Sequence, residues 1–110
     1  MDDVGAPSVA SMEVSAAGPG GLTVKVSGEL DYSSAPSLES EVDRILGLTA
    51  SSIVFDLGDL RFMDSSGIAI LLRIVDVFGP ATVVHPTSII RRVVENLGLE
   101  TLLRLAEGGR

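Results

Sequence analysis

The chain has 110 residues, no cysteine and a formal net charge of −7. This length fits one domain, the lack of cysteine excludes disulfides and thiolate chemistry, and the acidic balance argues against a nucleic-acid partner. The longest apolar run, Ile68 to Leu72, is too short to span a bilayer, so we expect no membrane segment and a cytoplasmic protein.

The first predicted element is a β-hairpin. Residues 1–11 are small and polar without a period, which predicts a flexible tail before a domain over residues 12–106, and residues 107–110 form a second tail. Met12 to Val14 and Leu22 to Ser27 alternate apolar and polar residues around a glycine-rich turn. This pattern is typical of two antiparallel strands.

A helix is expected next. Ser34 is the predicted N-cap, and Pro36 is tolerated in the first turn. Gly47 should end the helix. One apolar stripe runs along it, made of Leu38, Val42, Ile45 and Leu46.

The centre of the chain predicts a strand, a loop and a second helix. Ile53 to Phe55 is a short run of β-formers, and Asp64 is a good N-cap for the helix that ends at Phe78. Ser65 and Ser66 are then the first helical residues, where backbone N–H groups point outward and the helix dipole is positive. The sequence therefore predicts a serine in a position that tolerates a phosphate.

The remaining elements complete an alternating order. Ala81 to Val84 predicts a strand, Thr87 the cap of a third helix, and Thr101 to Leu105 a last strand. The third helix should align Ile90, Val93, Val94 and Leu97 and end at Asn96 and Gly98. The order β-β-α-β-α-β-α-β predicts an α/β fold with one mixed, mostly parallel sheet of about five strands and helices packed on it.

The helix that starts at Ser65 also carries a surface hypothesis. Its periodicity predicts a face toward the sheet, formed by Ile68, Leu71, Leu72 and Val75, and an opposite face with Ser66, Ile70, Arg73 and Val77. Two interpretations of the expected exposure of Ile70 and Val77 stay open. They are scattered apolar surface residues, which are common, or part of a protein-binding patch that begins at Ser65.

Three other kinds of site are disfavoured. A hydrolase triad of Asp64, Ser65 and His85 lacks the Gly-x-Ser-x-Gly elbow, and His85 is expected in a solvent-facing loop. A magnesium site at the isolated aspartates is less favoured than capping and turn roles, so no metal or other cofactor is expected. A response-regulator receiver needs an acidic pair after the first strand and a late lysine, whereas the one lysine here is Lys25.

Two motifs carry a family resemblance. Gly28-Glu29-Leu30-Asp31 and Phe62-Met63-Asp64-Ser65-Ser66-Gly67 together resemble the STAS domain of bacterial anti-sigma factor antagonists, over residues of about 12–106. In that family the unphosphorylated antagonist binds an anti-sigma factor that is also a serine kinase, and so frees a sigma factor. Phosphorylation ends the binding, and a PP2C-type phosphatase restores it.

The resemblance implies a binding module without catalytic residues of its own. It implies that Ser65 is phosphorylated, that Asp31 lies in the loop beside it, and that the kinase is an ATP-binding protein with a histidine-kinase-like fold. The free antagonist is expected to be a monomer that regulates transcription, as in stress response or sporulation. The expected partner-binding residues are Asp31, Ser33, Ser34, Asp64, Ser65, Ser66, Gly67, Ile70, Arg73 and Val77.

A second hypothesis is a stand-alone STAS regulatory subunit of a transporter or another signalling complex. Such modules need not keep the serine motif, so the intact stretch from Asp64 to Gly67 favours sigma-factor regulation. Ala69 departs from the glycine that close relatives often carry there, but it is also small.

Overall fold

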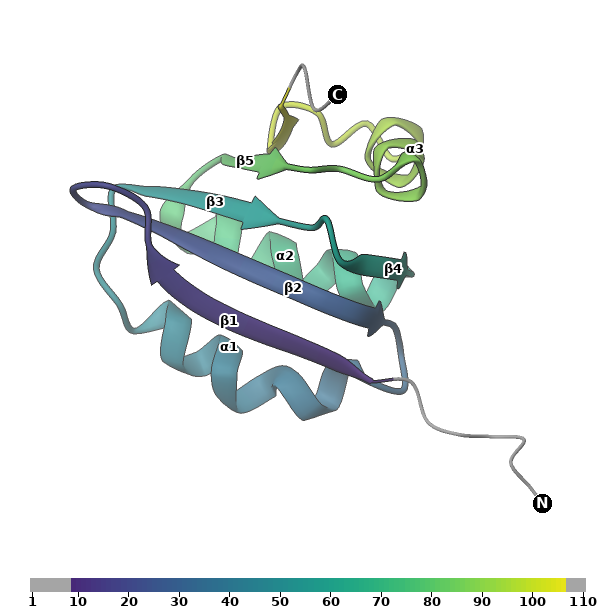
Figure 1. The fold of residues 1–110 in the computed structure, drawn as a ribbon, viewed down its shortest axis with the longest axis horizontal. Coiled ribbons are helices and arrows are strands. Elements are labelled where there is room, and N and C mark those ends of the chain that lie inside the picture. Colours follow the sequence, from purple (N-terminus) through teal and green to yellow (C-terminus); the bar gives the residue numbers. More distant parts are fainter. Residues whose placement is uncertain (1–8, 107–110) are drawn as a thin grey trace.

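A mixed sheet carries the fold of residues 9–106, the part of the chain that the computed structural model describes (Figure 1). β1 (Ala10–Ala16) and β2 (Gly21–Leu30) pair antiparallel, which confirms the predicted hairpin. β1 begins inside the predicted N-terminal tail of residues 1–11. The rest of that tail, at 1–8, and the predicted C-terminal tail at 107–110 lie outside the described residues.

Beyond β2 the sheet continues with parallel strands. β3 (Ser52–Asp56), β5 (Ala81–Val84) and β6 (Leu103–Leu105) follow in the spatial order β1-β2-β3-β5-β6. The predicted fold class is therefore confirmed. β6 starts later than the predicted Thr101, because residues 100–102 form a turn.

A sixth strand was not predicted. β4 (Leu60–Met63) pairs in parallel with the last three residues of β2, Gly28 to Leu30. The prediction that a loop alone precedes the second helix is therefore wrong, because residues 60–63 form a strand. β2 is ten residues long and β3 pairs only with its first half, Gly21 to Lys25. Without β4, the backbone N–H and C=O groups along this edge of the second half of β2 would lack hydrogen-bond partners. β4 is a short strand whose first and last residues are buried, and it supplies these partners.

Two helices lie next to each other on one side of the sheet. Figure 1 shows α2 (Ser65–Phe78) passing behind the strands and α1 (Glu39–Leu46) alongside, near β1. A short 3₁₀ helix, Ala35–Leu38, leads into α1. Leu38, Val42 and Ile45 are buried and Leu46 is partly buried, which confirms the predicted apolar stripe.

The predicted phase of α2 is wrong at one position. Ile70 was expected on the exposed face, but it is only 3% exposed, whereas Val77 is 55% exposed as predicted. α2 contacts α1 and the 3₁₀ helix as well as β3 and β4. A helix packed against both a sheet and a second helix is buried over a wider arc than one apolar stripe. Ile70 and Ile74, one turn apart, are both buried, in agreement with this wider arc.

α3 (Ser88–Asn96) begins as predicted, because the Ile90 N–H donates a hydrogen bond to the Thr87 hydroxyl at 3.3 Å. Ile90 and Val94 are buried, but Leu97 is 55% exposed, so its place in the apolar row was wrong. Leu97 lies just past the last helical residue and no longer follows the helical period. None of the helices in the described part of the chain is long and apolar enough to cross a membrane.

Candidate functional site

The start of α2 is built on the carboxylate of Asp64. Its Oδ1 accepts hydrogen bonds from the backbone N–H groups of Ser66, at 2.8 Å, and Gly67, at 3.3 Å. The prediction that Asp64 is the N-cap is confirmed. Ser65 is the first helical residue and its side chain is exposed, while Ser66 is partly buried. The structure thus presents one exposed hydroxyl at the positive end of a 14-residue helix.

The second oxygen of Asp64 reaches another segment of the chain. Its Oδ2 accepts a hydrogen bond from the backbone N–H of Tyr32 at 3.1 Å. Tyr32 belongs to the loop that follows β2. One carboxylate therefore fixes both the first turn of α2 and the neighbouring loop. This contact brings the loop of Asp31 and Ser33 close to the start of α2, as the family resemblance implied.

The loop after β2 is also held by its own hydrogen bonds. Asp31 Oδ1 accepts from the backbone N–H of Ser33, at 3.0 Å, from that of Ser34, at 3.1 Å, and from the Ser33 hydroxyl, at 3.0 Å. Such Asx-type bonds close a turn. Asp31 is partly buried and Ser33 is exposed. Asp31 thus shapes the loop, and Ser33 is on its surface.

Ser34 stands at the predicted N-cap position, but its side chain has a different role from the predicted one. It is only 2% exposed, and its hydroxyl donates to the Glu29 carbonyl at 2.6 Å and accepts from the Asp31 N–H at 3.0 Å. No side-chain hydrogen bond from Ser34 caps the 3₁₀ helix that follows. The hydroxyl is instead bonded to backbone groups at the end of β2 and in the loop that follows it. Ser34 therefore supports the loop from inside and offers no surface for a partner.

Gly67 is buried as well, which corrects its expected place in the binding surface. A Cβ atom at Gly67 would lie 2.6 Å from the Met63 Cγ and 2.7 Å from the Leu30 carbonyl oxygen. The first turn of α2 thus approaches the ends of β2 and β4 too closely for any side chain. Glycine in the motif is explained by this packing.

The exposed face of α2 continues through Arg73 and Val77. The Arg73 guanidinium bridges to α1, with Nη1 2.9 Å from Glu39 Oε1 and Nη2 3.5 Å from Asp43 Oδ1. The hydrogen bond to Glu39 is the main reason that the pKa of Arg73 is raised. Val77 follows one turn later, about 18 Å along the helix from Ser65 at 1.5 Å per residue. Arg73 and Val77 are accessible, whereas Ile70 is part of the core.

Two exposed aromatic residues near the ends of β2 and β4 were not predicted as site residues. Tyr32 is 82% exposed, and Phe62, two residues before Asp64 on β4, is 45% exposed. A signal was present in the sequence. Tyr32 is the only tyrosine and lies in a polar segment where no apolar period explains it.

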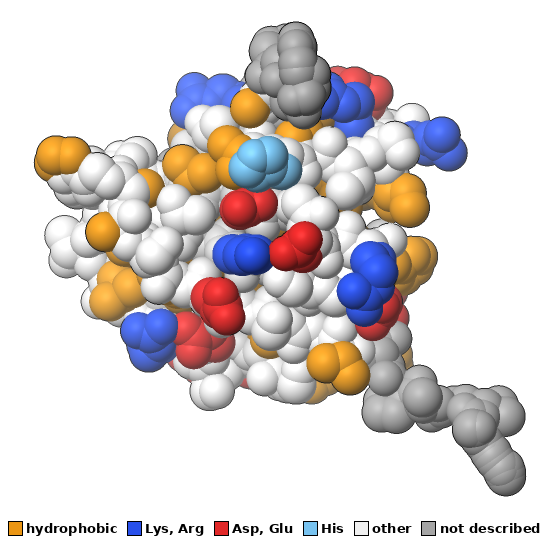
Figure 2. Space-filling model, viewed as in Figure 1, with side chains coloured by type: hydrophobic (Ala, Val, Ile, Leu, Met, Phe, Trp, Pro, Cys, Tyr) orange, Lys and Arg blue, Asp and Glu red, His pale blue; other side chains and the backbone are white. Residues whose placement is uncertain are grey.

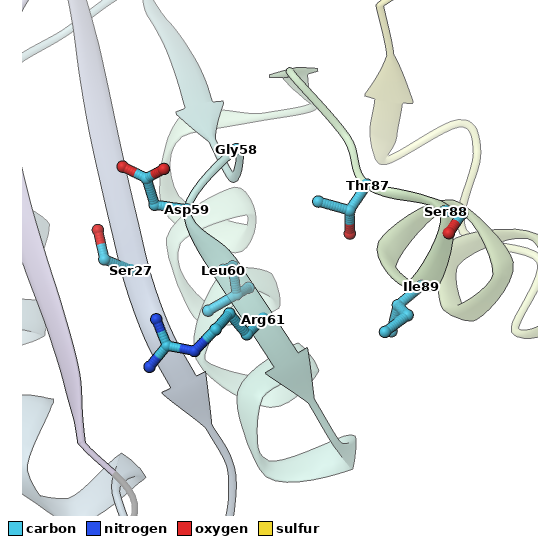
Figure 3. Close-up of a pocket in the computed structure, with 8 residues that line it drawn as sticks. All are labelled: Ser27, Gly58, Asp59, Leu60, Arg61, Thr87, Ser88 and Ile89. Atoms are coloured by element: carbon cyan, nitrogen blue, oxygen red, sulfur yellow. The ribbon is translucent and has the colours of Figure 1, made fainter.

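A groove lies between β4 and the start of α3 (Figure 3). It has a volume of about 660 Å³ and its rim includes the side chain of Ile89, which points toward β4. Two charged groups of the lining already have partners. Arg61 Nε donates to Glu29 Oε2 at 2.8 Å, and Asp59 Oδ2 lies 3.1 Å from Lys25 Nζ. The lining residues are Ser27, Gly58, Asp59, Leu60, Arg61, Thr87, Ser88 and Ile89.

The opposite side of the sheet from α2 carries paired charges. Figure 2 shows acidic and basic side chains alternating near the centre of this side. His85 Nδ1 is 3.2 Å from Asp56 Oδ1, which also accepts the Gly58 N–H at 3.1 Å. Burial by itself raises the pKa of Asp56, but the hydrogen bonds from Gly58 and His85 outweigh it and lower that pKa. The pairing of His85 with Asp56 gives no support to a triad with Ser65.

The sequence comparisons agree on one family. The model of the STAS domain family matches residues 13–107. The anti-sigma-F factor antagonist RsfB of Mycobacterium tuberculosis is 29% identical over 99 residues, which cover 86% of this chain and 81% of that protein.

The structural comparisons agree as well. An anti-sigma factor antagonist from Mycobacterium paratuberculosis superposes with a TM-score of 0.76 at 27% identity, over 89% of this chain and 86% of the other. The anti-sigma factor antagonist SpoIIAA in its unphosphorylated form shares the fold with a TM-score of 0.67 at 21% identity, over 89% of this chain and 90% of the other.

Proposed function

This chain belongs to the STAS domain family, and we propose that it acts as an anti-sigma factor antagonist. In its unphosphorylated form it binds an anti-sigma factor and thereby releases a sigma factor. The anti-sigma factor is also an ATP-binding serine kinase with a histidine-kinase-like fold. It phosphorylates Ser65, the antagonist dissociates, and a PP2C-type phosphatase restores the binding form.

The observation that carries this proposal is the position of Ser65. Its exposed side chain is at the first residue of α2, and the carboxylate of Asp64 already occupies the N–H groups of Ser66 and Gly67. A kinase can therefore reach the hydroxyl without unfolding the helix. The names of the relatives RsfB and the antagonist from Mycobacterium paratuberculosis support the same role.

The binding surface in this proposal is smaller than the sequence suggested. It consists of the exposed side chains of Ser33, Ser65, Arg73 and Val77 together with the partly buried Ser66. Asp31 and Asp64 hold the surface in shape through the hydrogen bonds that they accept. Ser34, Gly67 and Ile70 are buried and are left out of it.

The switch acts at the interface and leaves the fold intact. Phosphorylation adds about −1.5 to −2 charges, and the N-terminus of a helix stabilises negative charge. The phosphorylated domain should therefore stay folded. Binding is lost because the phosphate adds bulk and a charge that must be desolvated in the contact. In this scheme the chain is the substrate of the kinase and contributes no catalytic residue or cofactor.

A binding experiment tests the proposal. The tagged protein and its Ser65→Asp variant are used to capture partners from a bacterial lysate, and purified anti-sigma kinases are then titrated against both. We expect capture of a histidine-kinase-like ATPase by the wild type and at least about tenfold weaker binding by Ser65→Asp, with unchanged melting temperatures. Capture of a transporter component instead would contradict the proposal and favour the alternative of a transporter subunit.

A further inference from the structure

Two large aromatic side chains, near the ends of β2 and β4, are exposed and have no structural role in the core. Tyr32 is 82% exposed and Phe62 is 45% exposed, in a chain that has only one tyrosine and three phenylalanines. Tyr32 follows the end of β2, and Phe62 lies opposite Glu29 of β2 on the neighbouring strand. Both therefore lie at the same end of the sheet as Ser65.

The backbone that carries Tyr32 is already fixed. Its N–H is bonded to Asp64 Oδ2 at 3.1 Å, the residue before it closes an Asx turn, and the Ala35 N–H donates to the Asp31 carbonyl at 2.8 Å. Because the loop backbone is already ordered, little backbone entropy is lost when a partner covers Tyr32. Tyrosine has only two rotatable side-chain bonds and a large contact area, so it is an effective anchor in such a position.

The charges near this surface favour a protein as the occupant. Arg73 is paired with Glu39 and Asp43, and Arg61 is paired with Glu29. A nucleic acid or an anionic lipid surface needs unpaired basic side chains, and the whole chain has a net charge of −7. Exposed aromatic side chains on a surface whose arginines are already paired are instead typical of a protein interface, in which a few aromatic anchors supply most of the affinity.

We propose that Tyr32 is the anchor of the surface around Ser65 and that its ring enters an apolar pocket of the partner protein, with Phe62 packed against the rim of that pocket. The pocket contains a hydrogen-bonding group for the phenol hydroxyl, because a buried tyrosine O–H needs a partner. This inference rests on the proposed function, since the occupant is the anti-sigma kinase that binds over Ser65. It adds two residues and the chemistry of the kinase surface that meets them.

The test compares four variants in titrations with a purified anti-sigma kinase that the wild type binds. Tyr32→Ala should weaken binding at least about tenfold. Tyr32→Phe, which keeps the ring, and Phe62→Ala should each lose a smaller factor. The matched control is Leu97→Ala, which truncates another exposed apolar side chain at the far end of α3 and should bind within twofold of the wild type. Melting temperatures exclude misfolding.

A second readout does not depend on mutation. Because the chain has one tyrosine, labelling with ¹³C-tyrosine gives one set of ring signals in the full protein. These signals should shift and broaden when the kinase is added. An unchanged Tyr32 spectrum at saturation, or a Tyr32→Ala variant that binds like the wild type, would contradict the proposal that Tyr32 is the anchor.

The outcomes also separate the two proposals. If the wild type binds no anti-sigma kinase, the proposed function fails and the anchor fails with it. If the wild type binds and Tyr32→Ala binds equally well, only the anchor fails. Sedimentation of the wild type and of Tyr32→Ala tests whether a second copy of this chain occupies the surface instead. A self-association that disappears in Tyr32→Ala would mean that the aromatic surface joins two copies of this chain, which also contradicts the proposal.

Discussion

Asp64 and Tyr32 are joined by a hydrogen bond of 3.1 Å from the Tyr32 N–H to Asp64 Oδ2, while Asp64 Oδ1 caps α2. The two residues are far apart in the sequence: Asp64 belongs to the second motif, and Tyr32 directly follows the first motif, which ends at Asp31. A single carboxylate thus connects the loop after β2 with the helix that begins at Ser65. The geometry of the proposed binding surface depends on this connection.

Replacing Asp64 should loosen both segments. Asp64→Ala removes the N-cap and the link to Tyr32, and loss of a cap costs about 0.5–2 kcal/mol of stability. Asp64→Asn keeps one acceptor oxygen, so we expect a smaller loss. Urea denaturation measures the stabilities, and hydrogen exchange measures protection of the Tyr32 amide, which should fall in both variants. Unchanged protection of that amide in Asp64→Ala would contradict the link.

The corrected phase of α2 gives a paired prediction. Ile70 is 3% exposed and Val77 is 55% exposed on the same helix. Ile70→Ala should lose about 2–5 kcal/mol of stability, as other large-to-small changes in a core do. Val77→Ala should stay within about 0.5 kcal/mol, as expected for an exposed position. Both values come from chemical denaturation. Equal losses in the two variants would mean that the structure has the helix in the wrong rotation.

Gly67 should not tolerate even one added methyl group. In Gly67→Ala the new Cβ meets the Met63 Cγ at 2.6 Å and the Leu30 carbonyl oxygen at 2.7 Å, and the carbonyl cannot move without shifting β2. Overpacking of this kind costs about 1–3 kcal/mol.

Gly47→Ala is the matched control for Gly67→Ala. Gly47 has a negative φ of −89°, and the nearest atom to an added Cβ is 3.6 Å away, so its stability should hardly change. A stability equal to the wild type in Gly67→Ala, measured by thermal melting, would contradict the close packing.

Local patterns in the sequence were sufficient for most of the elements. The alternation in Leu22 to Ser27 and the side-chain chemistry of Asp64 and Thr87 act over a few residues, so the hairpin and two helix starts could be predicted. β4 could not, because it forms only where the longer β2 leaves an edge that β3 does not cover. That edge exists only in the assembled sheet.

The candidate site was predicted in part for the same reason. The motif located Ser65 and its cap, which depend on neighbouring residues. The burial of Ile70 depends on which other elements pack against α2, and the burial of Ser34 depends on how the loop folds back on the end of β2. The exposure of Tyr32 is a property of the folded loop as well. Periodicity assigns a side chain to a face of its own element, but it does not tell which faces other elements cover.

The proposed function requires that the kinase phosphorylates Ser65, and site mapping tests this claim. The wild type, Ser65→Ala and Ser66→Ala are incubated with a purified anti-sigma kinase and ATP, and phosphopeptides are mapped by mass spectrometry. We predict one phosphate on Ser65 in the wild type and in Ser66→Ala, and none in Ser65→Ala, which should still bind the kinase. A phosphate on Ser66, or a kinase that binds the wild type without phosphorylating it, would contradict the claim.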